Sequence, residues 1–207
     1  KTLQEYRTYI ALAETYIRDV RCGIILMHGL SGSGKTWFSK QCAQRLFAIR
    51  VRSDIERKRL HGLPADAQTQ SAPNASIYSR QASINTYAKL AELAESIVKS
   101  GFSVIIDAAF LQLKMRQDFL RLAEQLKVPM IILSCQAPIP ILKQRIRDRL
   151  AGNTDASEAD IAILDQQLHN QQPLSEAELQ HTLVIDTQQD SRIETALSQL
   201  RDLGIGN

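Results

Sequence analysis

Residues 24–41 read IILMHGLSGSGKTWFSKQ and contain the stretch that decides the fold. Within them, residues 29–36 match G-x-x-x-x-G-K-[ST], the Walker A phosphate loop. Its glycines allow the backbone to turn tightly, so that backbone N–H groups can approach an anion closely. The apolar run 24–27 predicts a strand before the loop, and a helix is predicted from Thr36 onward. The stretch therefore predicts a site for the phosphates of a nucleotide.

Two side chains at the end of this loop have defined tasks in the motif. Lys35 is expected to reach the β- and γ-phosphates, and the Thr36 hydroxyl is expected to bind Mg²⁺. The helix that follows adds N–H donors without helical partners and the positive end of its dipole. We predict as nucleotide-binding residues of the loop Gly29, Ser31, Gly32, Ser33, Gly34, Lys35 and Thr36.

Composition is typical of one soluble α/β domain, with or without a small insertion. The 207 residues are 44% hydrophobic and 23% charged, and the formal charge of +3 is too small to indicate a nucleic-acid or membrane partner. Three scattered cysteines match no metal or disulfide pattern, so we expect a cytoplasmic protein. No apolar run has the length of a membrane span. The first residue is Lys rather than Met, which is consistent with a fragment of a longer protein.

Working outward from the loop, hydrophobic periodicity predicts strands that alternate with helices. The predicted strands are 24–27, 48–52, 103–108, 130–135 and 183–185. The predicted helices are 2–20, 35–46, one from residue 53, 79–99, 112–127, 140–150, one from about residue 157, and 191–203. This alternation indicates a parallel sheet with right-handed crossovers. Helix 2–20 is either a leading element or the end of a preceding domain, and 61–78 is predicted to be a long loop.

Asp54 follows the second predicted strand, at the sheet edge where ligands of parallel α/β proteins bind. Ser53 and Glu56 have capping-box spacing, so we expect Ser53 to cap the next helix and leave Asp54 available. Asp54 could accept the proton of an attacking hydroxyl or hold Mg²⁺ through water. Arg57, one turn later, could bind an anionic part of the acceptor. Alternatively, Asp54 only stabilises the helix dipole and pairs with Arg57 or Lys58.

The acceptor of the phosphoryl group is expected to bind beside these residues. Its pocket is predicted among Asp54, Arg57, the loop 61–78 and the start of the following helix. Tyr78 and Arg80 are further candidate ligands there. Nothing in this region matches a known specificity pattern.

An acidic residue at the tip of an apolar strand is the Walker B arrangement. Asp107 ends such a strand and is expected to hold Mg²⁺ directly or through water. Asp186 ends the fifth strand in the same way, so the pattern alone does not distinguish the two, and we favour Asp107. For either residue, the alternative is an aspartate that only bonds to a neighbouring loop.

Arg145 and Arg149 are four residues apart on a predicted helix and therefore share a face. The helix stops at Gly152-Asn153, and a polar stretch follows, which suits a mobile lid over about residues 143–160. Arginines on a closing lid would neutralise the charge that develops on the transferred phosphoryl group. The alternative is a solvated basic face. We favour Arg145 as the catalytic arginine of the two.

With these residues laid out, the chain resembles the small P-loop kinases: shikimate, gluconate and adenylate kinases, and the kinase half of polynucleotide 5′-hydroxyl kinases. It is most similar to a bacterial family of predicted P-loop kinases, often fused behind an aminoglycoside-phosphotransferase-like domain. That pattern is carried by LMHGLSGSGKTW (26–37), IRVRSDIERKRLHGL (49–63), FSVIIDAAFL (102–111) and DASEADIAILDQQ (155–167). The likeness covers roughly residues 22–190, and only the phosphate loop is specific by itself.

This resemblance implies ATP as the donor, a P-loop NTPase three-layer α/β/α fold with sheet order 2-3-1-4-5, and a helical lid after strand four. Residues 1–21 would then be a leading helix or linker from the fused domain, and 22–207 the kinase domain. Asp54 matches the acceptor-activating carboxylate of the polynucleotide-kinase type, and Arg57 its acceptor-phosphate contact. Arg145 or Arg149 matches the lid arginine.

Two departures from the family patterns concern the predicted active site. Shikimate kinases carry Asp-x-Asp after strand two, where this chain has Ser-Asp. The third strand ends in Asp-Ala-Ala rather than Asp-Ala-Thr or Asp-Thr-Asn, so a hydroxyl is missing beside Asp107. How the metal and its waters are held there is left open.

The residues favour an ATP- and Mg²⁺-dependent kinase that phosphorylates a hydroxyl of a small molecule, with Lys35, Asp54 and Arg145 as catalytic residues. One alternative is a polynucleotide 5′-hydroxyl kinase, although aromatics are only 5% of the chain and no stacking groove is visible. Another is a nucleotide-binding module that regulates a fused or partner domain. We expect no membrane partner and no nucleic-acid partner.

Overall fold

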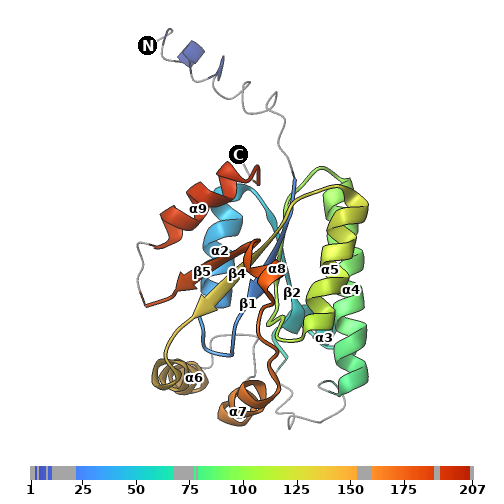
Figure 1. Cartoon of the computed structure of the whole chain (residues 1–207), viewed down its shortest axis with the longest axis vertical. Helices are drawn as coiled ribbons and strands as arrows, with labels where there is room; N and C mark the ends of the chain where they lie inside the picture. Colours follow the sequence, from blue (N-terminus) through green and yellow to red (C-terminus); the bar gives the residue numbers. More distant parts are fainter. Residues whose placement is uncertain are drawn as a thin grey trace.

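Five parallel strands form the sheet, in a computed structural model that describes residues 3, 5–7, 9–10, 22–67, 77, 79–152, 160–188 and 192–205. The strands are β1 (Ile24–His28), β2 (Ile49–Arg52), β3 (Val104–Asp107), β4 (Met130–Gln136) and β5 (Thr182–Asp186). Their order is β2-β3-β1-β4-β5, and all neighbouring pairs are parallel. The order 2-3-1-4-5 expected from the resemblance is confirmed. Because β1 is central, the phosphate loop lies at the middle of the sheet's carboxyl edge (Figure 1).

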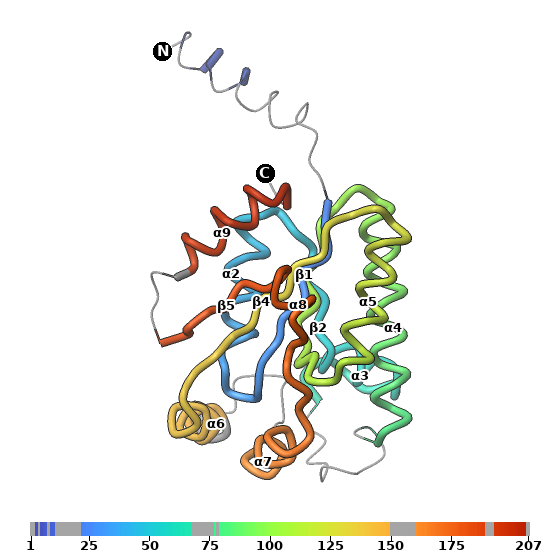
Figure 2. Tube along the Cα trace, viewed as in Figure 1, coloured from blue at the N-terminus to red at the C-terminus, as the bar shows by residue number. Residues whose placement is uncertain are grey.

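Helices cover both faces of this sheet and complete three layers. One face carries α2 (Lys35–Leu46) and α9 (Arg192–Asp202), and the other carries α4 (Arg80–Lys99) and α5 (Leu113–Leu126) (Figure 1). The short helix α3 (Ser53–Leu60) follows β2, and the short helix α8 (Glu176–Leu179) precedes β5. Beyond the carboxyl ends of the strands lie α6 (Ile139–Gly152) and α7 (Ile161–Asn170) (Figure 2). Of the lid predicted over about residues 143–160, residues 143–152 belong to α6, and α7 begins just after the predicted end.

The two sides of β1 explain why its sequence is an uninterrupted apolar run. Ile25 and Met27 pack toward α2 and α9, whereas Ile24 and Leu26 pack toward α4 and α5. All of them have no solvent exposure. A strand buried on both faces needs no polar alternation, as is usual in parallel sheets covered by helices.

A third, smaller apolar cluster joins the helices beyond the sheet edge. Leu142 and Ile146 of α6 and Leu164 of α7 are its buried members. Packed against them are Leu30, Ala137, Ile161 and Leu168. We call this set the α6–α7 cluster. Because Leu30 belongs to the phosphate loop, the loop packs against the helical pair as well as against the sheet.

Local signals at helix ends were predicted with mixed success. The helix predicted over 79–99 is capped by Ser79, whose Oγ accepts from the Ala82 N–H at 3.1 Å. The expected cap at Ser53 is wrong: Ser53 is the first helical residue, the N-cap is Arg52, and no side chain caps the helix. Arg52 still has extended backbone angles, so the chain enters α3 directly from β2.

Several predicted segments lie partly or wholly outside the described residues. Of helix 2–20, the described positions 3, 5–7 and 9–10 are helical, and the rest lies outside them. Tyr78, residues 68–76 of the predicted loop and residues 153–159 of the predicted lid also lie outside them. Among the residues that the structure describes, no helix is both long and apolar enough to cross a bilayer.

Candidate functional site

Two glycines fix the shape of the phosphate loop between β1 and α2. Gly29 has a φ of 136°, and a Cβ there would lie 2.3 Å from the carbonyl oxygen of Cys135. Gly32 has a φ of 79°, and its Cβ would lie 2.6 Å from the carbonyl oxygen of Leu142. Both contacts are with backbone atoms, which cannot rotate away as a side chain would. Only glycine therefore fits these two positions without moving β4 or α6.

The predicted lysine of the motif lies along the loop. Lys35 Nζ donates to the carbonyl oxygens of Gly29 at 2.9 Å and Leu30 at 2.8 Å. Burial lowers the pKa of the Lys35 ammonium, and the nearby Asp107 carboxylate acts in the opposite direction. The ammonium is thus held at the concave side of the loop, within reach of a phosphate that entered it.

The loop opens into a cavity of about 750 Å³, which we call the main cavity. The predicted site residues that line it are Ser31, Gly32, Gly34, Lys35, Thr36, Asp54, Arg57, Asp107, Arg145 and Arg149. Residues lining it that we did not predict are Trp37, Lys40, Arg50, Arg52, Ser53, Tyr87, Ala108, Ala109, Ile163 and Gln167. Gly29 and Ser33, though in the loop, are not among the lining residues. Arg80 is exposed at the start of α4 and also does not line this cavity in the described part of the chain.

Asp54 enters the main cavity from the first turn of α3. Its two carboxylate oxygens accept from Arg52, at 3.2 Å from Nε and 2.6 Å from Nη2. Oδ1 also accepts from the Ile55 N–H at 3.0 Å. The partner is therefore a strand arginine that we did not predict. Arg57 donates Nη1 to the carbonyl oxygen of Ile77 at 3.1 Å, so it links α3 to the segment before α4.

Asp107 forms the other carboxylate of the main cavity and is only 5% exposed. Its Oδ2 accepts from Ser39 Oγ at 3.0 Å and from Arg50 Nε and Nη2 at 3.2 and 2.5 Å. Asp186 instead accepts from the N–H of Gln188, two residues later, at 3.0 Å, which is a local turn contact. Of the two strand-end aspartates, Asp107 is the one that lines the cavity beside the loop.

The oxygen atoms available beside the loop suit magnesium. Thr36 and Asp107 line the same cavity and offer a hydroxyl and a carboxylate, which are the hard donors that Mg²⁺ prefers. The described residues contain no group of three or more His, Cys, Asp or Glu side chains that could hold a metal. A sparse protein donor set is usual for Mg²⁺, which is commonly bound by one or two carboxylates together with substrate phosphates.

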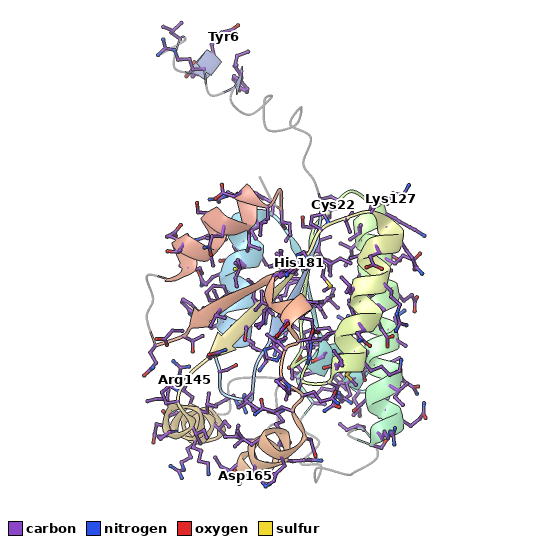
Figure 3. The ribbon with its side chains drawn as sticks, viewed as in Figure 1. Tyr6, Cys22, Lys127, Arg145, Asp165 and His181 are labelled. Atoms are coloured by element: carbon purple, nitrogen blue, oxygen red, sulfur yellow. The ribbon has the colours of Figure 1, made fainter. Side chains whose placement is uncertain are left out.

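Arg145 connects α6 with the loop after β5. Its Nη1 donates to Thr187 Oγ1 at 2.9 Å and its Nη2 to the Thr187 carbonyl oxygen at 2.8 Å. A longer contact of 3.4 Å joins Nη1 to the carbonyl oxygen of Gly32 (Arg145 is labelled in Figure 3). Thr187 was not predicted, because it carries no motif and is far from the phosphate loop in the sequence.

A second cavity of about 260 Å³, the side cavity, is also lined by Arg145. It is lined by Gly34, Trp37, Phe38, Arg145, Ile185, Thr187 and Ile193. Gly34, Trp37 and Arg145 line both cavities, so the two adjoin at the phosphate loop. A mainly apolar hollow with a guanidinium and an indole at its edge has the character of a site for a flat ring.

Comparison with known proteins identifies the family. A family model described as "AAA domain" matches residues 24–174, which is more than half of the chain. The chain belongs to this AAA-domain family. Uncharacterized proteins of Mycobacterium tuberculosis and Mycobacterium bovis are 26% identical over 154 residues, or 74% of this chain. The match covers 31% of those relatives, so the chain spans about a third of their length.

Solved structures of P-loop proteins share the fold of this AAA-domain protein. Kti12 of Chaetomium thermophilum, in complex with ADP-AlF3, has a TM-score of 0.68 at 14% identity, over 89% of this chain and 100% of that chain. A sugar kinase of Janibacter sp. HTCC2649 has a TM-score of 0.62 at 20% identity, over 90% and 99% of the two chains. At these identities the likeness shows the fold, that of the P-loop kinases.

Proposed function

We propose that this AAA-domain protein is a Mg²⁺-dependent kinase that transfers the γ-phosphate of ATP to a hydroxyl group of a small molecule. One observation carries the proposal: the phosphate loop with Lys35 and the carboxylate of Asp54 face the same cavity. A kinase needs a grip on the donor and an acceptor-activating group within one space. The kinase fold and the sugar kinase among its structural neighbours support this function.

The two adjoining cavities suit the two ends of ATP. The side cavity, with Trp37 and Arg145 at its edge, would take the adenine ring. The backbone N–H groups of the loop and Lys35 would bind the phosphates, and Thr36 with Asp107 would hold Mg²⁺. When bound, Mg²⁺ would neutralise negative charge on the β- and γ-phosphates. ADP-AlF3 bound to Kti12, which shares the fold, supports nucleotide binding here.

Asp54 would act on the acceptor. Its carboxylate would accept the proton of the acceptor hydroxyl while the hydroxyl oxygen bonds to the γ-phosphorus, and ADP would leave with the bridging oxygen. Arg52, bonded to both carboxylate oxygens, would hold Asp54 in position. Arg145 and Arg149, which line the same cavity, would stabilise charge on the transferred group.

The charge of the main cavity favours an acceptor that is itself anionic. In the described part of the chain, its lining has seven cationic side chains against the two carboxylates of Asp54 and Asp107. This surplus exceeds the negative charge of a Mg²⁺–ATP complex. Arg57, at the Asp54 end, would then bind a phosphate or carboxylate group of the small molecule. If oligonucleotide binding depended steeply on salt concentration, a polynucleotide 5′ end would become the favoured acceptor.

A regulatory role is the second candidate, because the mycobacterial relatives are about three times as long as the matched segment. A longer protein could contain a partner domain, for which we propose the aminoglycoside-phosphotransferase-like kind. The AAA domain would then bind ATP and change the activity of that partner. In that case Asp54→Asn should leave the effect on the partner unchanged, whereas a kinase would lose its activity.

A phosphate-transfer screen tests the kinase proposal. The protein, Mg²⁺ and ATP labelled at the γ-phosphate are incubated with hydroxyl metabolites, as matched pairs with and without a phosphate or carboxylate group. We expect transfer to an anionic member of a pair, with loss in Lys35→Ala and a loss of about 100-fold or more in Asp54→Asn. Asp118→Asn, at a side chain of α5 that is 43% exposed, is the matched control and should be as active as the natural protein. Transfer that is undiminished in Asp54→Asn would remove the general base.

A further inference from the structure

Helix α7 brings one polar side chain onto the phosphate loop. The Oε1 atom of Gln167 accepts a hydrogen bond from the Ser31 N–H at 2.8 Å, across 136 residues of sequence. Only the oxygen of a carboxamide can accept a hydrogen bond, so this contact assigns the two ends of the Gln167 side chain. The Nε2 end, with its two N–H donors, is directed away from Ser31. Gln167 and Ile163, one turn earlier on α7, both line the main cavity.

α7 is seated firmly enough to fix this side chain. On one side, Leu164 is fully buried in the α6–α7 cluster, which includes Leu30 of the loop. Lys143 of α6 and Asp165 of α7 add an ion pair at 3.5 Å (Asp165 is labelled in Figure 3). The α7 turn that carries Gln167 is therefore packed directly against the loop it contacts.

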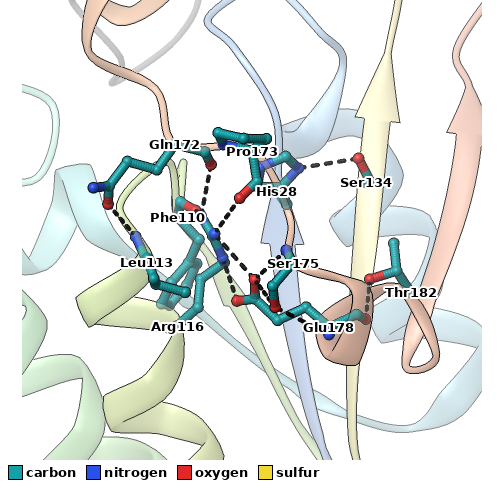
Figure 4. Close-up of polar contacts among 10 residues, drawn as sticks. All are labelled: His28, Phe110, Leu113, Arg116, Ser134, Gln172, Pro173, Ser175, Glu178 and Thr182. Atoms are coloured by element: carbon teal, nitrogen blue, oxygen red, sulfur yellow. Dashed lines mark hydrogen bonds and ion pairs between the residues drawn. The ribbon is translucent and has the colours of Figure 1, made fainter.

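The carboxyl-terminal end of α7 is tied to the start of α5. Gln112 Nε2 donates to the Asn170 carbonyl oxygen at 2.6 Å. Gln172 receives a hydrogen bond on Oε1 from the Leu113 N–H at 2.7 Å (Figure 4). The N–H of Gln172 donates to the Leu111 carbonyl oxygen at 2.9 Å. These contacts fix the position of the carboxyl-terminal end of α7, the helix that carries Gln167.

A buried arginine of α5 also holds the segment that follows α7. Arg116 is fully buried and donates to the carbonyl oxygens of Phe110, Gln172 and Pro173 and to both carboxylate oxygens of Glu178 (Figure 4). Three of these partners belong to the segment that follows α7. The segment is thus held against α5 by hydrogen bonds to a charged group, which are stronger than those between neutral groups.

The position of Gln167 relative to the two cavities indicates which phosphate of a bound nucleotide it would contact. Ser31 and Gln167 line the main cavity, with Asp54, and do not line the side cavity. A nucleotide with its ring in the side cavity would extend its phosphates across the loop toward Asp54. The terminal phosphate would therefore lie in the main cavity, which Gln167 lines, beyond the loop amides that hold the inner phosphates.

We propose that the Gln167 carboxamide donates a hydrogen bond from Nε2 to the γ-phosphate, so that α7 distinguishes ATP from ADP. This inference rests on the proposed function, because it takes ATP as the ligand of the main cavity. The Ser31 N–H holds the carboxamide oxygen and thereby orients the donor. Gln167 is then a nucleotide-specificity residue on a helix that contacts the loop from outside the sheet.

Binding of two nucleotides to two variants tests the proposal. Mg²⁺–ADP and the Mg²⁺ complex of β,γ-imido-ATP, which is not hydrolysed, are titrated calorimetrically into each protein. Gln167→Met keeps the length of the side chain and removes both donor and acceptor. Gln166→Met is the matched control, because Gln166 is the neighbouring, exposed glutamine of α7. Gln167→Glu, the second variant, keeps an oxygen for Ser31 but replaces the donor by a carboxylate, which also adds a negative charge.

In Gln167→Met and Gln167→Glu, we expect the affinity for β,γ-imido-ATP to fall about tenfold or more, as for loss of a hydrogen bond to a charged group. The affinity for ADP should stay within about twofold in Gln167→Met, and Gln166→Met should behave as the natural protein. An equal loss for both nucleotides, or no loss for either, would overturn the role of Gln167. If the natural protein bound neither nucleotide, the proposed function itself would fail.

Discussion

Replacing Arg116 by methionine should destabilise the protein strongly, because Arg116 has no exposure and several buried partners. Methionine fills a similar space and donates no hydrogen bonds. The Glu178 carboxylate would keep its Ser175 contacts but lose both bonds from the guanidinium. The carbonyl oxygens of Phe110, Gln172 and Pro173 would lose donors as well.

The size of this effect follows from removing one member of a buried ion pair. Arg116 and Glu178 are 0% and 9% exposed at their side chains, and the Nε–Oε1 distance is 2.6 Å. Breaking such a pair from one side costs about 3–5 kcal/mol of unfolding free energy, because a buried charge is left without its partner. In a domain of this size each kcal/mol changes Tm by about 2–4 °C, so we expect a fall of roughly 6–20 °C.

Urea denaturation followed by circular dichroism, with a thermal scan alongside, measures this loss. Arg121→Met is the control, because Arg121 lies on the same helix with a side chain that is 63% exposed. The double variant Arg116→Met with Glu178→Gln should lose less than Arg116→Met alone, since it removes the stranded carboxylate charge. A loss below about 1 kcal/mol in Arg116→Met would refute the reasoning, because a surface ion pair would give as much.

Two further predictions concern pH and the loop. Burial, with the positive charges of Arg116 and Lys35, lowers the pKa of His28 to about 4, so the unfolded chain binds a proton that the folded protein does not between that value and 6.5. The free energy of unfolding should therefore fall as the pH is lowered through this window. Urea titrations at several pH values should show a smaller fall in His28→Gln. Parallel profiles of unfolding free energy against pH for the two proteins would contradict this. Gly32→Ala places a Cβ 2.6 Å from the Leu142 carbonyl oxygen, so the loop must shift, and ADP affinity should fall at least about tenfold by calorimetry. Gly62→Ala, where a Cβ meets nothing within 4 Å, is the control, and equal ADP affinity in the two variants would count against the close approach.

The sheet and the location of the site were predictable because both depend on local signals. The apolar run of β1 and the glycine spacing after it define a strand, a loop and a helix within a short stretch. Parallel strands end at one edge, so Asp54 and Asp107 could be expected near Lys35, and the structure places all three around the main cavity. The order of the strands came from the family resemblance, since periodicity alone does not specify neighbours.

The partners of these residues could not be predicted, because they depend on register and on docking. Arg50 meets Asp107 because β2 pairs with β3 in a register that places Arg50 opposite Ile105, two residues before Asp107. A usable signal was present, since arginines at alternate positions of a strand in a covered sheet are unusual. Gln167 meets Ser31 only once α7 is packed on the loop. α8 was missed although Ser175 and Glu178 form a capping box there, because four residues are too few for a periodic pattern.

Leu30 of the phosphate loop packs against the α6–α7 cluster. A change in the shape of the loop would therefore alter how the two helices pack. Thermodynamic linkage makes such a dependence reciprocal. If a ligand in the loop stabilises one arrangement of the helices, then stabilising that arrangement increases the binding free energy of the ligand by the same amount. A compound or protein that clamped α6 against α7 from their outer surface would thus alter nucleotide affinity without entering either cavity.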